Sequence, residues 1–283
     1  MDGDVYVAEY IIRERLAEAR ARAKVAALHG EANQDAPRAN VIGHRLLEFA
    51  RSVVKKGGRR GRALDSRSEG DHSMTYTAKP LSCDPTKLRG LSEKLILGHW
   101  ENNYGGAVRR LNAIAAQLME LDFARAPVFV INGLKREELI ATNSMILHEL
   151  YFDGLGGDGT SGGTIDEALQ HDFGSVDRWR AEFVGMGKAL RGGSGWVLLS
   201  YSQRDRRLMN QWAADHAHAL AGGTPILALD MYEHSYQLDY GASAERYVDA
   251  FMENINWAHV ARLYRAHASS EAESEFQVWR AIR

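Results

Sequence analysis

A glycine-rich segment at residues 154–164, GLGGDGTSGGT, divides the sequence into two parts with different hydrophobic periodicity. Glycine has no side chain to pack and leaves the backbone free, so we interpret this segment as a linker. Apolar residues before it recur at helical spacing, whereas short apolar runs typical of strands follow it. The sequence therefore predicts an α+β fold in which helices precede a small antiparallel sheet.

The part before the linker predicts a helical hairpin. Ser92 is a good N-cap for a long helix that carries His99 and runs to about Asp122, with Gly105 and Gly106 as a kink or close-packing point. A second helix is expected from about 136 to 150.

The second predicted helix carries His148 near its end. Its expected start rests on Glu137 and Glu138, because acidic side chains in the first turn interact favourably with the helix dipole. Both histidines therefore lie on helices of the same hairpin.

The part after the linker predicts an α+β domain. A helix is expected around 175–190, followed by a β-hairpin whose strands begin at Trp196 and Arg207. A third strand starts at Pro225 and ends at Asp230, which gives a three-stranded antiparallel sheet, and helical periodicity returns over 244–266.

An extra helical extension is expected at 1–74. Amphipathic helices are predicted at about 12–23 and 41–54, followed by the basic run KKGGRRGR at 55–62 and a polar stretch expected to be mobile. A boundary near Met74 then gives three regions, which are the partly mobile extension at 1–74, the helical hairpin domain at 75–160 and the α+β domain at 161–283.

Charge and cysteine content exclude several classes of protein. The formal net charge of −2 argues against binding nucleic acid or a membrane through the overall field. A single cysteine, Cys83, permits neither an internal disulfide nor a multi-cysteine metal cage, so a metal would need histidine and carboxylate ligands. The N-terminus is unlike a signal peptide and no apolar run approaches a membrane span, so we expect a cytoplasmic protein.

The string DMYEHSY contains Asp230 and His234, four residues apart, where the third strand ends. A carboxylate and a neutral imidazole are suitable ligands for iron, manganese or zinc. Taken alone, each of these residues, like His99 and His148, is equally well explained as a turn residue or a hydrogen-bonded core histidine.

Further motifs surround these residues in a fixed order. They are YTAKPLSCDPTKLRGLSEKLILGHW at 76–100, AVRRLN at 107–112, HELYF at 148–152, GSGW at 193–196, DMYEH at 230–234 and NW at 256–257. Over roughly 75–267 the sequence thereby resembles the iron/manganese superoxide dismutase family.

The resemblance implies one iron or manganese ion per chain, held between the two domains by four ligands. These ligands are His99, His148, Asp230 and His234. Three neutral imidazoles and one carboxylate leave a charge of about +1 on a divalent site, or about +2 on a trivalent one, which attracts a small anion. The implied activity is that of an antioxidant oxidoreductase, a superoxide dismutase that converts superoxide to dioxygen and hydrogen peroxide.

The proton-delivering residues of the family are altered here. The position of the family's gateway tyrosine falls on Ala107, and that of a histidine one helical turn earlier falls on Asn103. Tyr104 is close in sequence and can either supply a phenol or serve only in packing.

The glutamine that hydrogen-bonds the solvent on the metal is also replaced. Many iron enzymes supply it from the second helix, where this chain has Ser144, and manganese enzymes supply it from the sheet, where the sequence ADHA at 214–217 falls. We expect His216 to take its place, with His218 as the alternative. A group from the sheet favours manganese slightly over iron.

The resemblance also assigns residues to an apolar wall around the metal and to a subunit interface. Trp196 and Tyr232 are expected to form the apolar wall around the metal, or to be plain core aromatics. Glu233 is the residue that pairs across a two-fold interface in the family, so a homodimer is expected. The second tyrosine of a family pair becomes Gln237, and an entrance arginine falls on Ala244, with Arg246 nearby.

These departures leave a second function open. A dismutase-like scaffold that keeps its metal for stability, while the extension at 1–74 binds a partner, also fits the altered residues. Turnover of superoxide distinguishes the two functions.

Overall fold

The computed structural model describes residues 75–268. The extension predicted at 1–74, with its two helices and basic run, lies outside these residues. Within the described part, helices precede and surround a three-stranded antiparallel sheet, which confirms the predicted α+β fold class. The division between a domain at 75–160 and one at 161–283 stays a prediction.

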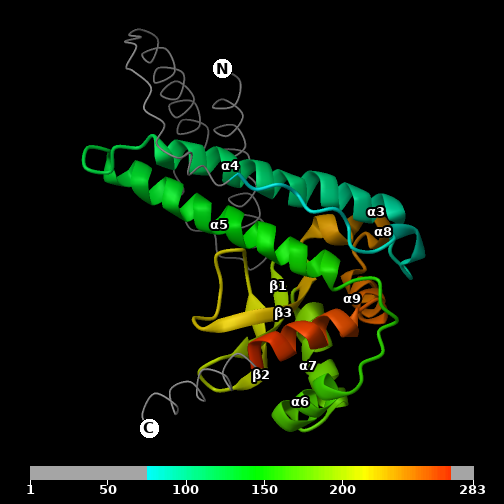
Figure 1. The fold of residues 1–283 in the computed structure, drawn as a ribbon. Coiled ribbons are helices and arrows are strands. Elements are labelled where there is room, and N and C mark those ends of the chain that lie inside the picture. Colours follow the sequence, from blue (N-terminus) through cyan, green and yellow to red (C-terminus); the bar gives the residue numbers. More distant parts are fainter. Residues whose placement is uncertain (1–74, 269–283) are drawn as a thin grey trace, which may run out of the picture. The chain divides into compact units, whose positions relative to one another are not determined.

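The first half of the described chain is a helical hairpin. Figure 1 shows its two long helices, α4 and α5, side by side, with the end of α5 reaching toward the sheet. The elements are η1 Pro85–Lys87, α3 Glu93–Gly98, the π-helical segment η2 His99–Tyr104, α4 Gly105–Met119 and α5 Val128–Asp153.

The first helical arm begins where the sequence predicts. The Ser92 hydroxyl accepts a hydrogen bond from the Leu95 amide (3.1 Å), which caps α3. The irregularity expected at Gly105 occupies the preceding turn instead, as the wider π-helical segment that begins at His99. Such segments are frequent at functional sites.

The second arm, α5, starts at Val128 rather than at the predicted Arg136. Pro127 precedes it in an extended conformation, and proline favours a helix start because its φ is fixed and it has no amide hydrogen. Glu137 therefore lies inside the helix, where it forms an ion pair with Arg110 of α4. The interpretation of Glu137 as a first-turn residue was wrong.

The glycine-rich segment is irregular, as expected, but it is packed against the chain. The Gly157 amide donates to the Asn254 carbonyl oxygen (3.0 Å) and the Gly159 amide to the Ile255 carbonyl oxygen (3.2 Å). A Cβ atom on Gly157 would lie 2.2 Å from the Ile255 oxygen, so glycine is needed for this close approach. At Gly157 the missing side chain thus serves close packing.

Substitution of Gly157 by alanine should destabilise the fold by about 2–3 kcal/mol, because the added methyl group overlaps the backbone at Ile255. Denaturant unfolding measures this loss. Gly162→Ala is the matched control, since a Cβ atom there meets nothing within 4 Å. Equal stabilities of the two variants would show that the segment does not pack as described.

The sheet places the site residue Asp230 beside Trp196. Its strands are β1 Trp196–Ser202, β2 Arg207–Ala213 and β3 Gly223–Asp230, in the order β2-β1-β3. The predicted hairpin and third strand are confirmed. In the register of β1 with β3, Trp196 is the partner of Asp230, the last residue of its strand.

The remaining helices cover the sheet and follow it (Figure 1). They are α6 Thr164–Phe173, α7 Val176–Ala189, η3 Glu233–Ser235, α8 Gln237–Tyr240, α9 Ala244–Glu253 and a last helix at 257–268. The helical segment predicted over 244–266 is confirmed, but as two helices. It is interrupted after Glu253, where the Asn254 and Ile255 carbonyl groups accept hydrogen bonds from the glycine-rich segment.

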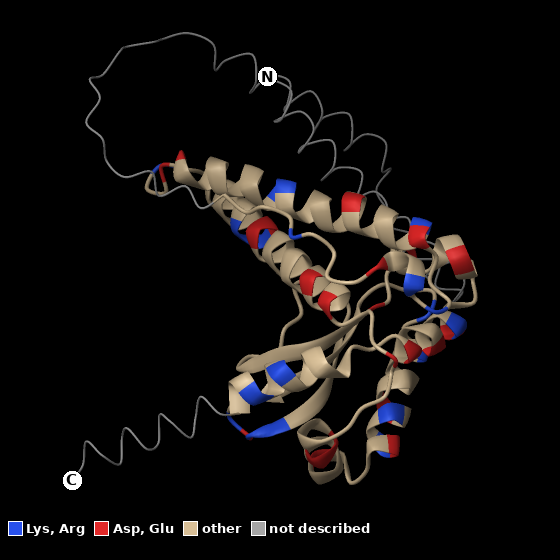
Figure 2. Ribbon diagram, turned by 45° about the vertical axis from the view of Figure 1, so that its right-hand side comes forward, with Lys and Arg blue, Asp and Glu red and all other residues tan. Residues whose placement is uncertain are grey.

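Acidic and basic residues are interspersed over the described helices, as Figure 2 shows. This agrees with the small net charge of the sequence. Within residues 75–268, none of the helices has the length and apolar character needed to cross a membrane.

Candidate metal centre

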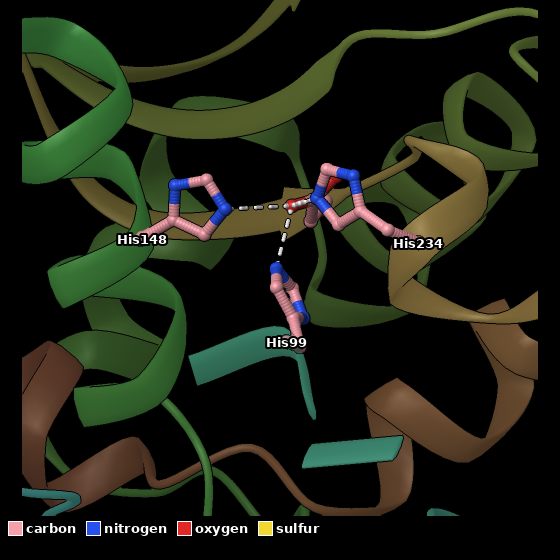
Figure 3. Close-up of side chains that lie close together, drawn as sticks. His99, His148 and His234 are labelled. Carbon is pink, nitrogen blue, oxygen red and sulfur yellow. Dashed lines mark hydrogen bonds and ion pairs between the residues drawn. The ribbon is translucent and has the colours of Figure 1, made fainter. Parts of the chain in front are cut away.

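Four side chains meet where the end of α5 approaches the end of β3. Figure 3 shows the imidazoles of His99, His148 and His234 directed at one carboxylate oxygen, Asp230 Oδ2. The Nε2 atoms lie 3.2, 3.6 and 3.3 Å from it, respectively. One potential ligand atom from each residue lies within 4.8 Å of all the others. The structure thus brings together all four residues predicted as ligands.

Each of these residues sits at a defined point of an element. His99 begins the π-helical segment, His148 lies in the penultimate turn of α5, and Asp230 ends β3. The short helix η3 then turns His234 back toward Asp230. The Ser235 hydroxyl stabilises this turn through hydrogen bonds to the carbonyl oxygens of Asp230 (2.8 Å) and Tyr232 (2.7 Å).

Hydrogen bonds to the outer atoms leave the inner atoms free to bind a metal. His148 Nδ1–H donates to the Ser144 carbonyl oxygen (2.6 Å), so its Nε2 carries the lone pair. Asp230 Oδ1 accepts from the Tyr232 amide (2.8 Å), while Oδ2 faces the imidazoles. Ser144 was not recognised from the sequence in this role, because a backbone carbonyl leaves no signal there.

Buried ring nitrogens without a hydrogen bond test whether a metal fits. Within the described residues, both ring nitrogens of His99 and Nε2 of His148 are buried and make no hydrogen bond. Buried polar atoms normally have a partner, and an imidazole lone pair beside a carboxylate is a typical site for iron, manganese or zinc. The donor set therefore fits a single metal ion.

Burial keeps the imidazoles of His99 and His148 neutral. It lowers the pKa of His99, and it lowers the pKa of His148 well below the usual value. For Asp230, burial alone would raise the pKa, but His234 and His99 outweigh it and lower the pKa well below the usual range. At neutral pH the cluster therefore offers an anionic oxygen and the neutral ring nitrogens of His99 and His148, the forms that bind metal.

Aromatic residues enclose the buried side of the cluster. The rings of Tyr151 and Phe152 lie 5.1 and 5.0 Å from that of His99, and Trp196 makes an edge contact with His148 at 5.3 Å. All three are buried. Trp196 lies in the predicted wall, whereas Tyr151 and Phe152 belong to the recognised HELYF motif but were not predicted individually.

His216 lies beside the cluster, and His218 does not. The His216 ring stacks on Tyr232 at 4.8 Å and is 6.1 Å from that of His148. The ring of Tyr232 stacks in turn on His234. His218 is exposed and pairs with Asp215 (3.0 Å).

The tautomer of His216 follows from its neighbour. Trp196 Nε1 can only donate a hydrogen bond, so His216 Nδ1 accepts it (2.9 Å) and the proton of the neutral ring is on Nε2. Burial lowers the pKa of His216 to about 4. The ring is therefore a neutral donor at physiological pH.

The Tyr104 hydroxyl is engaged outside the cluster. It accepts from the Lys79 amide (2.8 Å) and donates to Glu149 Oε1 (3.0 Å), and burial raises its pKa to about 12. Glu149 also forms an ion pair with the Lys79 ammonium. Tyr104 thus links the segment that precedes α3 to helix α5, which fits the interpretation of Tyr104 as a packing residue. Its partner Glu149 was not predicted from the sequence.

Two other residues singled out in the sequence differ in solvent exposure. Glu233, expected at a subunit interface, is exposed next to His234. Ala107, at the position of the gateway tyrosine, is buried on α4.

The fold and the cluster together define a class of protein, an α+β protein whose three histidines and one aspartate fit a single metal ion. A family model described as "Iron/manganese superoxide dismutases, C-terminal domain" matches residues 161–263. The chain is 70% identical to "Superoxide dismutase [Fe]" of Cupriavidus metallidurans over 193 residues, which cover 68% of this chain and 98% of the relative. The chain belongs to the iron/manganese superoxide dismutase family.

More distant relatives are named for both metals. "Superoxide dismutase [Fe]" of Aquifex pyrophilus is 33% identical over 68% of this chain and 93% of its own length. "Superoxide dismutase [Mn] 1" of Halobacterium salinarum is 35% identical over 64% of this chain and 91% of its own length. Because the relative at 70% identity is named for iron, the comparisons do not support the expected lean toward manganese.

Proposed function

We propose that this protein is a superoxide dismutase, which converts two superoxide anions and two protons to dioxygen and hydrogen peroxide. The observation that carries the proposal is the convergence of three imidazoles on Asp230 in a chain of this family. A bound iron or manganese ion would supply a redox couple that accepts one electron and then returns one. The protein supplies the metal ligands, a buried environment that excludes water, and hydrogen-bond donors.

The named residues divide this work between them. His99, His148, Asp230 and His234 would hold the ion. Trp196 excludes water from the buried side and fixes His216 by its hydrogen bond. His216 then presents an Nε2–H donor on the side of the cluster where Tyr232 and His234 are partly exposed.

For the finer points we propose iron as the metal and a homodimer as the assembly. The iron-named relative at 70% identity supports the first. The exposed Glu233 beside His234 supports the second, since a charged residue next to a ligand can be covered by a second copy. An antioxidant role and a location in the cytoplasm stay predictions.

The test is superoxide decay with purified, iron-loaded protein. We expect acceleration far beyond that of the same concentration of free iron, and elemental analysis of protein from its native host should show about one metal ion per chain. Iron-replete protein without turnover would contradict the proposal and favour the scaffold function.

His216 should tune turnover without binding the metal. We expect His216→Gln to keep the metal content and change the turnover or the reduction potential, because glutamine keeps a hydrogen-bond donor but replaces the imidazole ring. His216→Ala removes the donor and should cost more, about 10-fold or more in turnover. Elemental analysis, superoxide decay and redox titration measure these effects.

His218→Gln is the matched control, since His218 is exposed in the same loop. Its activity should equal that of the unmodified protein. An unchanged rate and potential in both His216 variants would show that this ring does not act on the reaction.

A further inference from the structure

His216 lies on the loop at 214–222 that joins β2 to β3, where the chain forms neither helix nor strand. Two hydrogen bonds inside this loop involve Asp215. Its Oδ1 accepts from the Ala217 amide (2.7 Å), and its carbonyl oxygen accepts from the His218 amide (3.3 Å). These bonds shape the turn around His216, but they do not fix the turn to another element. Because loops open more easily than helices or strands, a hydrogen-bond donor on this loop needs an anchor outside it.

Two hydrogen bonds from other elements hold His216. Trp196 of β1 donates from Nε1 to the ring nitrogen Nδ1 (2.9 Å), which orients the imidazole. Asn143 of α5 donates from Nδ2 to the main-chain carbonyl oxygen of His216 (2.6 Å), which holds the backbone at this point of the loop. The ring is therefore tied to the sheet, and the backbone is tied to the helix.

The same turn of α5 also orients one of the four cluster residues. Ser144, which follows Asn143, accepts the hydrogen bond from His148 Nδ1–H through its carbonyl oxygen (2.6 Å). Asn143 and His148 are five residues apart in one helix, a rise of about 7.5 Å that the helix keeps constant. The bond from Asn143 to the loop therefore fixes His216 relative to His148, and the centroids of these two rings are 6.1 Å apart.

We propose that Asn143 positions His216 at the metal centre, by fixing the backbone of its loop to the helix that carries His148. The inference rests on the proposed function for the role of His216 as a hydrogen-bond donor beside the metal. Asn143 is a positioning residue, because its effect on the reaction passes through His216. A shift of the loop would change the distance and direction of the Nε2–H donor, and such surrounding hydrogen bonds tune the reduction potential of a metal site.

The test is a double-mutant cycle with a matched control. Asn143→Leu removes the donor and keeps a side chain of similar size, whereas Asn143→Ala removes most of the side chain. Each is made alone and together with His216→Ala, so that an effect through His216 is separated from an effect on the fold. Asn132→Leu is the control, since Asn132 is exposed about three turns earlier on α5.

Three readouts are taken on iron-loaded protein of equal metal content. Hydrogen exchange of the backbone amides at 214–218, followed by mass spectrometry, reports whether the loop is anchored. The reduction potential of the iron and kcat for superoxide report whether His216 acts on the metal. The exchange rate and the potential do not depend on turnover.

We expect Asn143→Leu to speed hydrogen exchange in the loop about fivefold, because one hydrogen bond to the loop backbone is lost. It should also shift the reduction potential in the same direction as His216→Ala and lower kcat about threefold to tenfold. Asn143→Ala should behave in the same way, and Asn132→Leu should match the unmodified protein. In the His216→Ala background, neither change at Asn143 should alter kcat or the potential further, because the ring that it positions is gone.

Three results would overturn the inference. Unchanged exchange in both Asn143 variants would show that the amide does not anchor the loop. Faster exchange with an unchanged potential and kcat would show that Asn143 only stabilises the loop. Equal losses with and without His216 would show that Asn143 acts on the fold. Failure of the unmodified protein to dismute superoxide would contradict the proposed function, while the exchange rate and the potential would still decide the role of Asn143.

Discussion

Replacement of Asp230 by asparagine should remove nearly all dismutase activity and most of the bound metal. The asparagine side chain would keep the shape of the aspartate but not the negative charge on which the three imidazoles converge. Loss of groups that merely support a metal ligand costs about 10- to 100-fold, so loss of this anionic ligand should exceed about 100-fold. Elemental analysis and superoxide decay, measured on the same preparation, test this expectation.

The control is Asp177→Asn, which removes the same charge from the exposed first turn of α7. Its activity and metal content should be unchanged. Full turnover in Asp230→Asn would mean that this carboxylate does not belong to the metal centre.

The ligand residues could be found from the sequence because each one belongs to a local motif. His148 stands in HELYF, and Asp230 and His234 stand together in DMYEH, each in the family's order. The hairpin and the three strands were predictable for a similar reason, since hydrophobic periodicity reports which face of an element is buried. Element types were therefore easier to predict than their ends.

The predicted helix boundaries were wrong where contacts between residues distant in sequence determine the end of a helix. The interruption after Glu253 depends on hydrogen bonds from Gly157 and Gly159, almost a hundred residues earlier, and nothing near Asn254 reveals them. Glu137 was assigned to a first turn by the local rule for helix dipoles, but its ion pair with Arg110 of the other helix explains its place. A single sequence carries no record of such pairings.

The surroundings of the metal residues were only partly predictable for the same reason. His216 could be proposed from the alignment of a loop, but its tautomer depends on the Trp196 hydrogen bond. Tyr104 illustrates the opposite case, because its phenol is close in sequence to His99 and yet bonds Lys79 and Glu149. Spacing in the sequence can show that a polar group lies near a site. Only its hydrogen-bond partners in the structure show what the group does there.

Removal of the metal should lower the thermal stability of the protein strongly. Without an ion, the buried Nε2 atoms of His99 and His148 make no hydrogen bond, and each such atom costs about 1–3 kcal/mol. A metal present at about a thousand times its dissociation constant stabilises the folded state by about 4 kcal/mol. For a chain of this size that corresponds to a fall in Tm of about 10 °C on removal.

Thermal unfolding before and after treatment with a chelator measures this fall, and addition of iron should restore the original Tm. The Asp230→Asn variant is the internal control, because a protein that binds little metal has little to lose. Its Tm should therefore hardly respond to the chelator. An equal fall in both proteins would show that the stabilising ion binds elsewhere, since the two differ only at the carboxylate that faces the three imidazoles.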